Sequence, residues 1–165
     1  MKILLAVDKS AASDKAVHFV ANILADRGSD EVSLTLLHTV ESIPDFLVDG
    51  GGGSHPRELY RQVVEEWEIA RRNEGQQLLD QQRQALIDAG VPETAIEIKL
   101  VVKESRPEAK KVIAAISIIE EMKRGDYSVV ALGRRGSSAA QGSFLGSVAE
   151  KVLRESNGRT VWVID

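Results

Sequence analysis

The chain has 165 residues and a formal net charge of −4; 43% of the residues are hydrophobic, 28% are charged and none is cysteine. This composition indicates one ordinary soluble domain, because single domains typically have about 100–200 residues. Without cysteine, the sequence excludes disulfide scaffolds, thiolate zinc sites, iron–sulfur clusters and cysteine nucleophiles.

The acidic balance also argues against a broad nucleic-acid-binding surface, since such surfaces are usually basic. The longest apolar runs are much shorter than the ~20 residues that cross a bilayer, and the N-terminus has no charged segment followed by an apolar one. We therefore expect a cytoplasmic protein with no membrane span and no nucleic-acid partner.

The chain opens with a pattern of strand, helix and strand. Residues 2–7 are a continuous apolar run that ends at Asp8, which is typical of a strand buried on both faces. From Ser13 onward, apolar residues recur at helical spacing until Gly28. Residues 32–38 are rich in branched side chains and predict the second strand.

A loop and a long helix come next. Residues 40–55 contain four consecutive glycines and no periodicity, which predicts a flexible loop inside the single domain 1–165. A helical stripe then extends from Pro56 to Ala89, with Gly90 as its C-terminal stop and Gly75 as a candidate bend.

The remaining elements continue the alternation. Strands are predicted at 96–102, 127–132 and 160–164, and helices from about Pro107 and over 147–154. Strands that alternate with helices indicate an α/β fold with three layers, in which helices cover both faces of an open parallel sheet.

The segment after the fourth strand is the most unusual part of the sequence. It is rich in glycine and serine, at Gly133, Gly136, Ser137, Ser138, Gly142, Ser143, Gly146 and Ser147. Glycine permits close backbone approach, backbone N–H groups can surround an anion, and a helix N-terminus adds a partial positive charge. From residue 133 to 165 the chain also has five basic and three acidic residues, a local excess of two positive charges. These features predict a phosphate site, and the alternative is a long flexible loop.

The spacing Gly133-x2-Gly136-x9-Gly146-Ser147 after an apolar strand resembles the nucleotide-binding signature of the universal stress protein family. The resemblance extends over essentially the whole chain, including the first strand that ends at Asp8. It implies a Rossmann-like fold of the adenine-nucleotide alpha-hydrolase type, with five strands in the order 3-2-1-4-5. ATP would lie where the strand order reverses, with Mg²⁺ or Mn²⁺ bound through its phosphates.

The resemblance also implies two groups of site residues. Those near the adenosine would be Ala6, Val7, Asp8, Thr39, Leu132 and Gly133; those around the triphosphate would be Arg135, Gly136, Gly146, Ser147 and Val148. In this comparison Asp8 holds the ribose or a metal-bridged phosphate, and Thr39 offers its backbone to the adenine edge. Two places depart from the family pattern: Lys9 stands where glycine often follows the aspartate, and Ser105-Arg106 precede Pro107 where the family commonly has a glycine.

Other candidate sites have weaker signals. The sequence has no Gly-x4-Gly-Lys-Ser/Thr motif, and its three histidines have no metal-ligand spacing. Ser10 can contact phosphate, whereas Ser13 is equally a phosphate contact or a helix cap. Of Arg134 and Arg135, at least one is expected to clamp phosphate.

The last strand is apolar on both faces, and the order 3-2-1-4-5 places it at an edge, where such a strand needs a cover. We therefore expect a homodimer through this strand, as the resemblance also suggests. Asp8 has no partner in the sequence pattern that would make an activated acid–base pair, so we expect no enzyme. The leading hypothesis is an ATP-dependent regulatory or stress-response module with an unidentified protein partner; the alternatives are a nucleotide-independent interaction module or a slow ATPase.

Overall fold

The computed structural model describes residues 1–25, 27, 31–43, 57–104, 112–137 and 144–165. Its elements follow in the order β1 (Lys2–Ala6), α1 (Ala11–Leu24), β2 (Ser33–Ser42), α3 (Arg57–Asp88), a 3₁₀ turn (Glu93–Ala95), β3 (Ile96–Glu104), α4 (Ile113–Arg124), β4 (Val129–Gly133), α5 (Ser147–Arg154) and β5 (Thr160–Ile164). All neighbouring strands are parallel, and their order in the sheet is β3-β2-β1-β4-β5. This confirms the predicted fold class and strand order.

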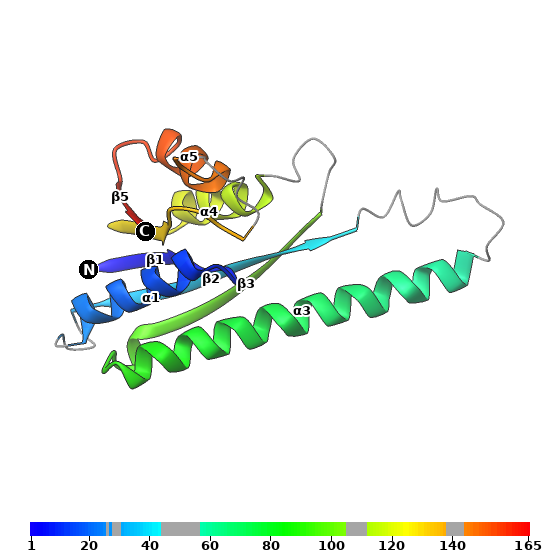
Figure 1. Cartoon of the computed structure of the whole chain (residues 1–165), viewed down its shortest axis with the longest axis horizontal. Coiled ribbons are helices and arrows are strands. Elements are labelled where there is room, and N and C mark those ends of the chain that lie inside the picture. The colour runs from blue at the N-terminus through cyan, green and yellow to red at the C-terminus, as the bar shows by residue number, and fades with distance from the viewer. Residues whose placement is uncertain (26, 28–30, 44–56, 105–111, 138–143) are drawn as a thin grey trace.

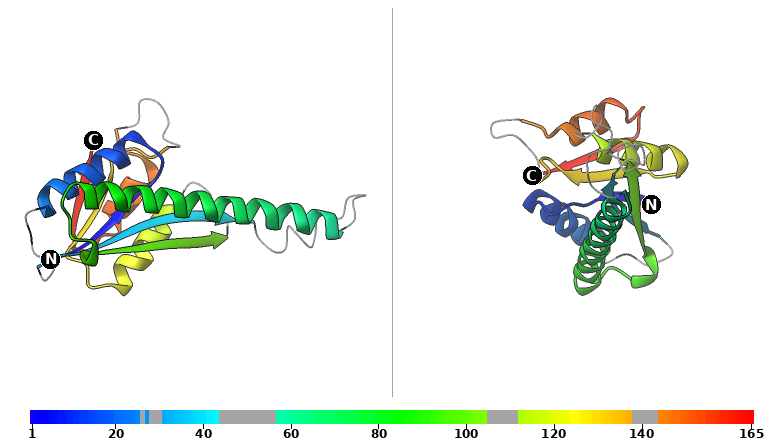
Figure 2. Two further views of the ribbon diagram at one scale, coloured as in Figure 1. Left: turned by 90° about the horizontal axis from the view of Figure 1, so that it is seen from below. Right: turned by 90° about the vertical axis from the view of Figure 1, so that its right-hand side faces the viewer.

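Helices cover both faces of the sheet: α1 and α3 lie on one side, and α4 and α5 on the other (Figures 1 and 2). Alternate residues of the central strand point to opposite layers, so Ile3 and Leu5 pack beneath α1 and α3. Leu4, in contrast, belongs to the apolar cluster beneath α4 and α5. Burial on both faces explains why the sequence of β1 is continuously apolar.

β2, β3 and α3 extend beyond the rest of the sheet and form an arm (Figure 1). β1 pairs with β2 only as far as Leu37, whereas the pairing of β2 with β3 continues to Ser42 and Glu104. α3 has 32 residues, which corresponds to about 48 Å of helix, and it packs along both strands.

Most predicted elements are confirmed, and several boundaries differ. β2 continues to Ser42 because β3 supplies backbone partners, so residues 40–42 are strand rather than the start of the predicted loop. Residues 44–56 of that loop lie outside the described residues, as do Gly28 and Pro107. α1 begins at Ala11 with Ser10 as its N-cap, so the alternative of a Ser13 cap is wrong. Within the described residues, no helix combines the length and apolar character that a bilayer crossing requires.

Gly75 has a different role from the predicted bend, since α3 is one continuous helix through this position. A Cβ atom at Gly75 would lie 2.7 Å from Val40 Cγ2 and 2.8 Å from Leu100 Cδ1. The glycine therefore lets the helix approach the arm of the sheet closely.

A polar network lies under α4. The Tyr127 hydroxyl donates to Glu121 Oε1 at 2.8 Å, and Lys99 Nζ lies 2.5 Å from Glu121 Oε2. Burial of Glu121 favours its neutral form, but the hydrogen bonds from Lys99 and Tyr127 outweigh this and lower the pKa of the carboxyl. Burial, together with the adjacent carboxylate, raises the pKa of Tyr127 to about 12.

We expect this network to make stability fall at high pH. The pKa of Tyr127 is higher in the folded state than in the unfolded state, so the folded protein binds more protons between about pH 10 and 12. The stability that Tyr127 contributes is fully present below the pKa of tyrosine in the unfolded chain. It is lost as the pH rises from about 10 to 12, which lowers the free energy of unfolding by about 2 kcal/mol. Urea unfolding measured from about pH 9 to 12 checks this. At about pH 9 the Tyr127→Phe variant should have a lower free energy of unfolding than the parent protein, but that free energy should fall less between about pH 9 and 12. Lys99 is present in both proteins, so equal slopes would contradict the assignment to Tyr127.

Candidate functional site

A cleft opens at the carboxyl ends of β1, β2 and β4, where the strand order reverses, which is the expected ligand position in such sheets. It consists of two adjoining cavities of about 280 Å³ and 70 Å³. We call it the cleft; its lining is Ala6, Val7, Asp8, Ser10, Ser13, Leu37, His38, Thr39, Glu41, Ala114, Ile118, Leu132, Gly133, Arg135, Gly136, Ser137, Gly146, Ser147, Val148 and Ala149.

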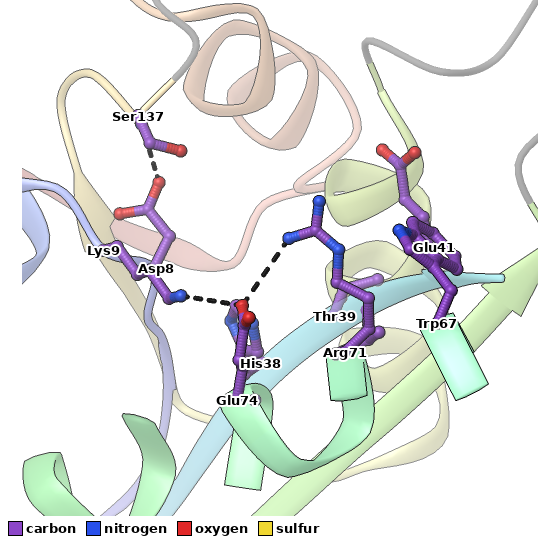
Figure 3. Close-up of a pocket in the computed structure, with 11 residues that line it drawn as sticks. Asp8, Lys9, His38, Thr39, Glu41, Trp67, Arg71, Glu74 and Ser137 are labelled. Atoms are coloured by element: carbon purple, nitrogen blue, oxygen red, sulfur yellow. Dashed lines mark hydrogen bonds and ion pairs between the residues drawn. The ribbon is translucent and has the colours of Figure 1, made fainter. Parts of the chain in front are cut away.

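Asp8 stands at the centre of the cleft and is held from two sides. Its Oδ1 accepts hydrogen bonds from the Ser10 backbone N–H at 3.0 Å and from the Ser10 hydroxyl. Its Oδ2 accepts from the Ser137 N–H at 2.9 Å, which connects β1 to the glycine-rich segment (Figure 3). The Asp8 N–H donates to Ser13 Oγ at 3.0 Å. Asp8 is therefore fixed in position before any ligand arrives, and a carboxylate has lone pairs for further donors.

The glycines of the signature allow close packing around Asp8. A Cβ atom at Gly136 would lie 2.8 Å from Asp8 Oδ2. At Gly133 it would meet the backbone of α1, at 2.8 Å from the carbonyl carbon of Ala12 and 2.9 Å from the Ser13 nitrogen. Glycine at both positions lets the segment after β4 approach the end of β1.

The start of α5 forms the opposite wall. Gly146 is its N-cap and has no side chain with which to cap the first turn. The Gly146 N–H donates to the Arg134 carbonyl at 2.9 Å, so the helix start is tied to the beginning of the glycine-rich segment. The first turn of a helix directs backbone N–H groups and a partial positive charge toward an anion.

The two arginines of this segment separate. Arg135 lines the cleft. Arg134 instead pairs with Asp165 at 2.6 Å, and its backbone N–H donates to the Ile164 carbonyl. Of the two arginines, only Arg135 is therefore placed to contact a ligand in the cleft. We expected at least one of the two to be available for a phosphate, and Arg135 is that residue.

The structure brings all eleven predicted site residues to the cleft: Ala6, Val7, Asp8, Thr39, Leu132, Gly133, Arg135, Gly136, Gly146, Ser147 and Val148. The sequence reasoning placed Ser137 in the glycine-rich segment without giving it a role of its own, and it missed five lining residues: Leu37, Glu41, Ala114, Ile118 and Ala149. A helical stripe marks an apolar face but does not tell which of its residues reach a ligand site. The signal for Ser137 was its place directly after Gly136.

Among the described residues, no three His, Cys, Asp or Glu side chains gather as a metal site of their own. His38 lies at the end of β2, with Nδ1 at 2.8 Å from the Val7 carbonyl oxygen. That contact ties β2 to the residue that follows β1. A metal at the cleft would accordingly need ligands from the bound molecule, in addition to Asp8.

This fold, with a glycine-lined cleft at the switch point of a parallel sheet, defines a Rossmann-like α/β domain. The family model described as the universal stress protein family matches residues 1–164, and the chain belongs to this family. No curated protein sequence matches the chain significantly.

Three solved structures illustrate the likeness. Universal stress protein UspA from Lactobacillus plantarum is 19% identical with a TM-score of 0.66, and the alignment covers 100% of this chain and 97% of that one. A universal stress protein in complex with cAMP is 18% identical, with a TM-score of 0.58 and coverage of 99% and 95%. A family member from Arabidopsis thaliana with AMP bound is 16% identical, with a TM-score of 0.55 and coverage of 99% and 90%. At these identities the structures establish the shared fold.

Proposed function

We propose that this chain is an ATP-binding regulatory module whose bound nucleotide, with Mg²⁺ or Mn²⁺, biases its conformation or its choice of protein partner. The observation that carries the proposal is the convergence of the Asp8 carboxylate, the glycine-rich segment and the start of α5 on one cleft. The adenine nucleotides in two structures of similar fold, AMP and cAMP, support the choice of ligand class.

The electrostatics of the cleft favour a phosphate at the α5 end. Three of the five basic residues after Gly133 already have carboxylate partners, in the pairs Arg134–Asp165, Lys151–Glu155 and Arg154–Glu150. Arg135 lines the cleft and adds a charged donor to the backbone N–H groups. Asp8, which lines both cavities of the cleft, suits a ribose hydroxyl or a metal ion.

The donor set also fits a magnesium nucleotide. Mg²⁺ is usually bound by one or two carboxylates together with substrate phosphates and water. Asp8 supplies one such carboxylate, next to the proposed phosphate position. When bound, the metal would neutralise part of the phosphate charge, and Asp8 would orient it.

We further propose a homodimer through β5 and a non-enzymatic role in the cytoplasm. β5 is an edge strand, with Val161 and Val163 on one face and Trp162 and Ile164 on the other. The hydrogen-bond partners of Asp8 are hydroxyl and backbone groups rather than a histidine or lysine that would activate it. Any hydrolysis would then be slow and dependent on a partner.

Purified protein tests the proposal directly. We expect anion exchange of the denatured supernatant to show ATP or ADP, and calorimetry with ATP and Mg²⁺ to show one site per chain. The same samples should release little phosphate over many hours. If the purified protein carries no nucleotide and binds none when it is added, the proposal is overturned in favour of an interaction module. If the protein hydrolyses ATP over multiple turnovers and Asp8→Ala loses this activity, an ATPase is favoured.

A further inference from the structure

A second pocket of about 360 Å³ adjoins the cleft on the side of α3 (Figure 3). We call it the α3 pocket. It shares Asp8, His38, Thr39, Glu41 and Ser137 with the cleft, so the two spaces meet beneath the Asp8 carboxylate. A ligand anchored in the cleft therefore has room to continue toward α3.

The α3 pocket extends along the helix. Glu74 pairs with Lys9 at one end, and Trp67 lies at the other (Figure 3). Glu74 follows Trp67 by seven positions along α3, which corresponds to about 10 Å of helix. The far end is thus well separated from the Asp8 end, where the ribose of a nucleotide in the cleft is proposed to bind.

The Trp67 end of the α3 pocket offers planar surfaces. The Arg71 guanidinium lies 5.2 Å from the centre of the Trp67 ring. Both groups are planar and half exposed, with 38% of Trp67 and 51% of the Arg71 side chain accessible. An indole and a guanidinium plane are the surfaces on which nucleobases stack in proteins.

The charges of the α3 pocket favour an uncharged ligand group with hydrogen-bond donors. Lys9 and Arg71 lie 3.0 Å and 3.6 Å from the same oxygen of Glu74, and Glu41 adds a second carboxylate. With Asp8, which also lines the α3 pocket, three carboxylates face two cations, so this pocket has an excess of negative charge and disfavours phosphate, unlike the phosphate end of the cleft. The ion pairs are largely exposed, so they hold the pocket only weakly and can rearrange around a ligand.

One unsatisfied polar atom belongs to a residue that lines both spaces. Thr39 Oγ1 is buried without a hydrogen-bond partner among the described residues, and Thr39 lines both spaces. An unsatisfied buried hydroxyl is uncommon, because it loses its hydrogen bonds to water. Amino groups on a planar ring would complement the carboxylates that line the α3 pocket.

We propose that the α3 pocket binds a second nucleobase, so that the preferred ligand is a dinucleoside polyphosphate with one adenosine in the cleft and the other base against Trp67 and Arg71. This inference rests on the proposed nucleotide binding in the cleft. It goes further by assigning a second base site to α3.

Calorimetry with ATP and with diadenosine tetraphosphate, both with Mg²⁺, tests the proposal. We expect the dinucleotide to bind at least about 10-fold more tightly than ATP, since base stacking on an aromatic side chain contributes about this much. Trp67→Ala should remove most of that advantage and leave ATP binding unchanged. Ile69→Ala is the matched control, because Ile69 is on the same helix, is 59% exposed and does not line the α3 pocket.

The outcomes separate the two proposals. If ATP binds and the dinucleotide binds no more tightly, the second base site is wrong while the proposed function stands. If Trp67→Ala weakens the binding of ATP, the base of a mononucleotide occupies the α3 pocket, and the proposal of a second base site is again wrong. If neither ligand binds, the proposed function fails first.

Discussion

Gly136→Ala is expected to weaken ATP binding by about 100-fold, which corresponds to about 3 kcal/mol. The added Cβ would lie 2.8 Å from Asp8 Oδ2, closer than a carbon and an oxygen can pack. The carboxylate must turn away, and its hydrogen bond from the Ser137 N–H is then lost or distorted. The carboxylate that is proposed to hold the ribose or the metal is then displaced, and the glycine-rich segment loses its contact with it. Calorimetry of the variant with ATP and Mg²⁺ measures the loss.

A second glycine variant controls for the change of residue type. Gly158 lies in the turn before β5 with φ of +82° and has no neighbour within 4 Å of an added Cβ. Gly158→Ala should therefore cost about 1–2 kcal/mol of stability through backbone strain and leave ATP affinity unchanged. Gly136 lies outside the left-handed region, so its variant should keep most of its stability. Unchanged affinity in Gly136→Ala, or global unfolding, would mean that the segment is structural.

The sequence predicts those features that depend on local pattern. The bounds of α5 and β5 are as predicted, because a glycine-serine start and an Asn157-Gly158 turn mark them in the chain. Parallel strands buried on both faces give apolar runs, which locate β1 and β4 within about two residues. The predicted site residues meet in one cleft because they lie near or after the carboxyl ends of β1, β2 and β4, which share one edge of the sheet.

Features that depend on tertiary contacts are not predictable in this way. β2 continues through Thr39 and Val40 because β3 and α3 accompany it beyond the central strands. Ala114 and Ile118 line the cleft because of how α4 crosses the sheet, which the periodicity of α4 does not specify. The α3 pocket likewise unites residues of β2 and α3 with residues that follow β1 and β4, and no sequence motif connects them.

Gly75→Val is expected to destabilise the fold by about 2–3 kcal/mol, the usual cost of overpacking a close contact. The branched side chain would meet Val40 and Leu100, which lie 2.7 Å and 2.8 Å from the position of its Cβ. The β-branched side chain of Val40 has few allowed χ1 rotamers, so it cannot move aside easily. For a domain of this size, the melting temperature should fall by about 4–12 °C.

The comparison with Asn73→Val separates packing from helix propensity. Residue 73 is exposed on α3, and asparagine and valine have similar helix propensities, so this variant should melt within about 1–2 °C of the parent protein. At Gly75 the same valine has a better helix propensity than the residue it replaces, by about 0.5 kcal/mol. Propensity alone therefore predicts stabilisation, whereas close packing predicts a loss. A Gly75→Val protein that melts at or above the parent temperature would show that α3 can separate from the arm of the sheet at little cost.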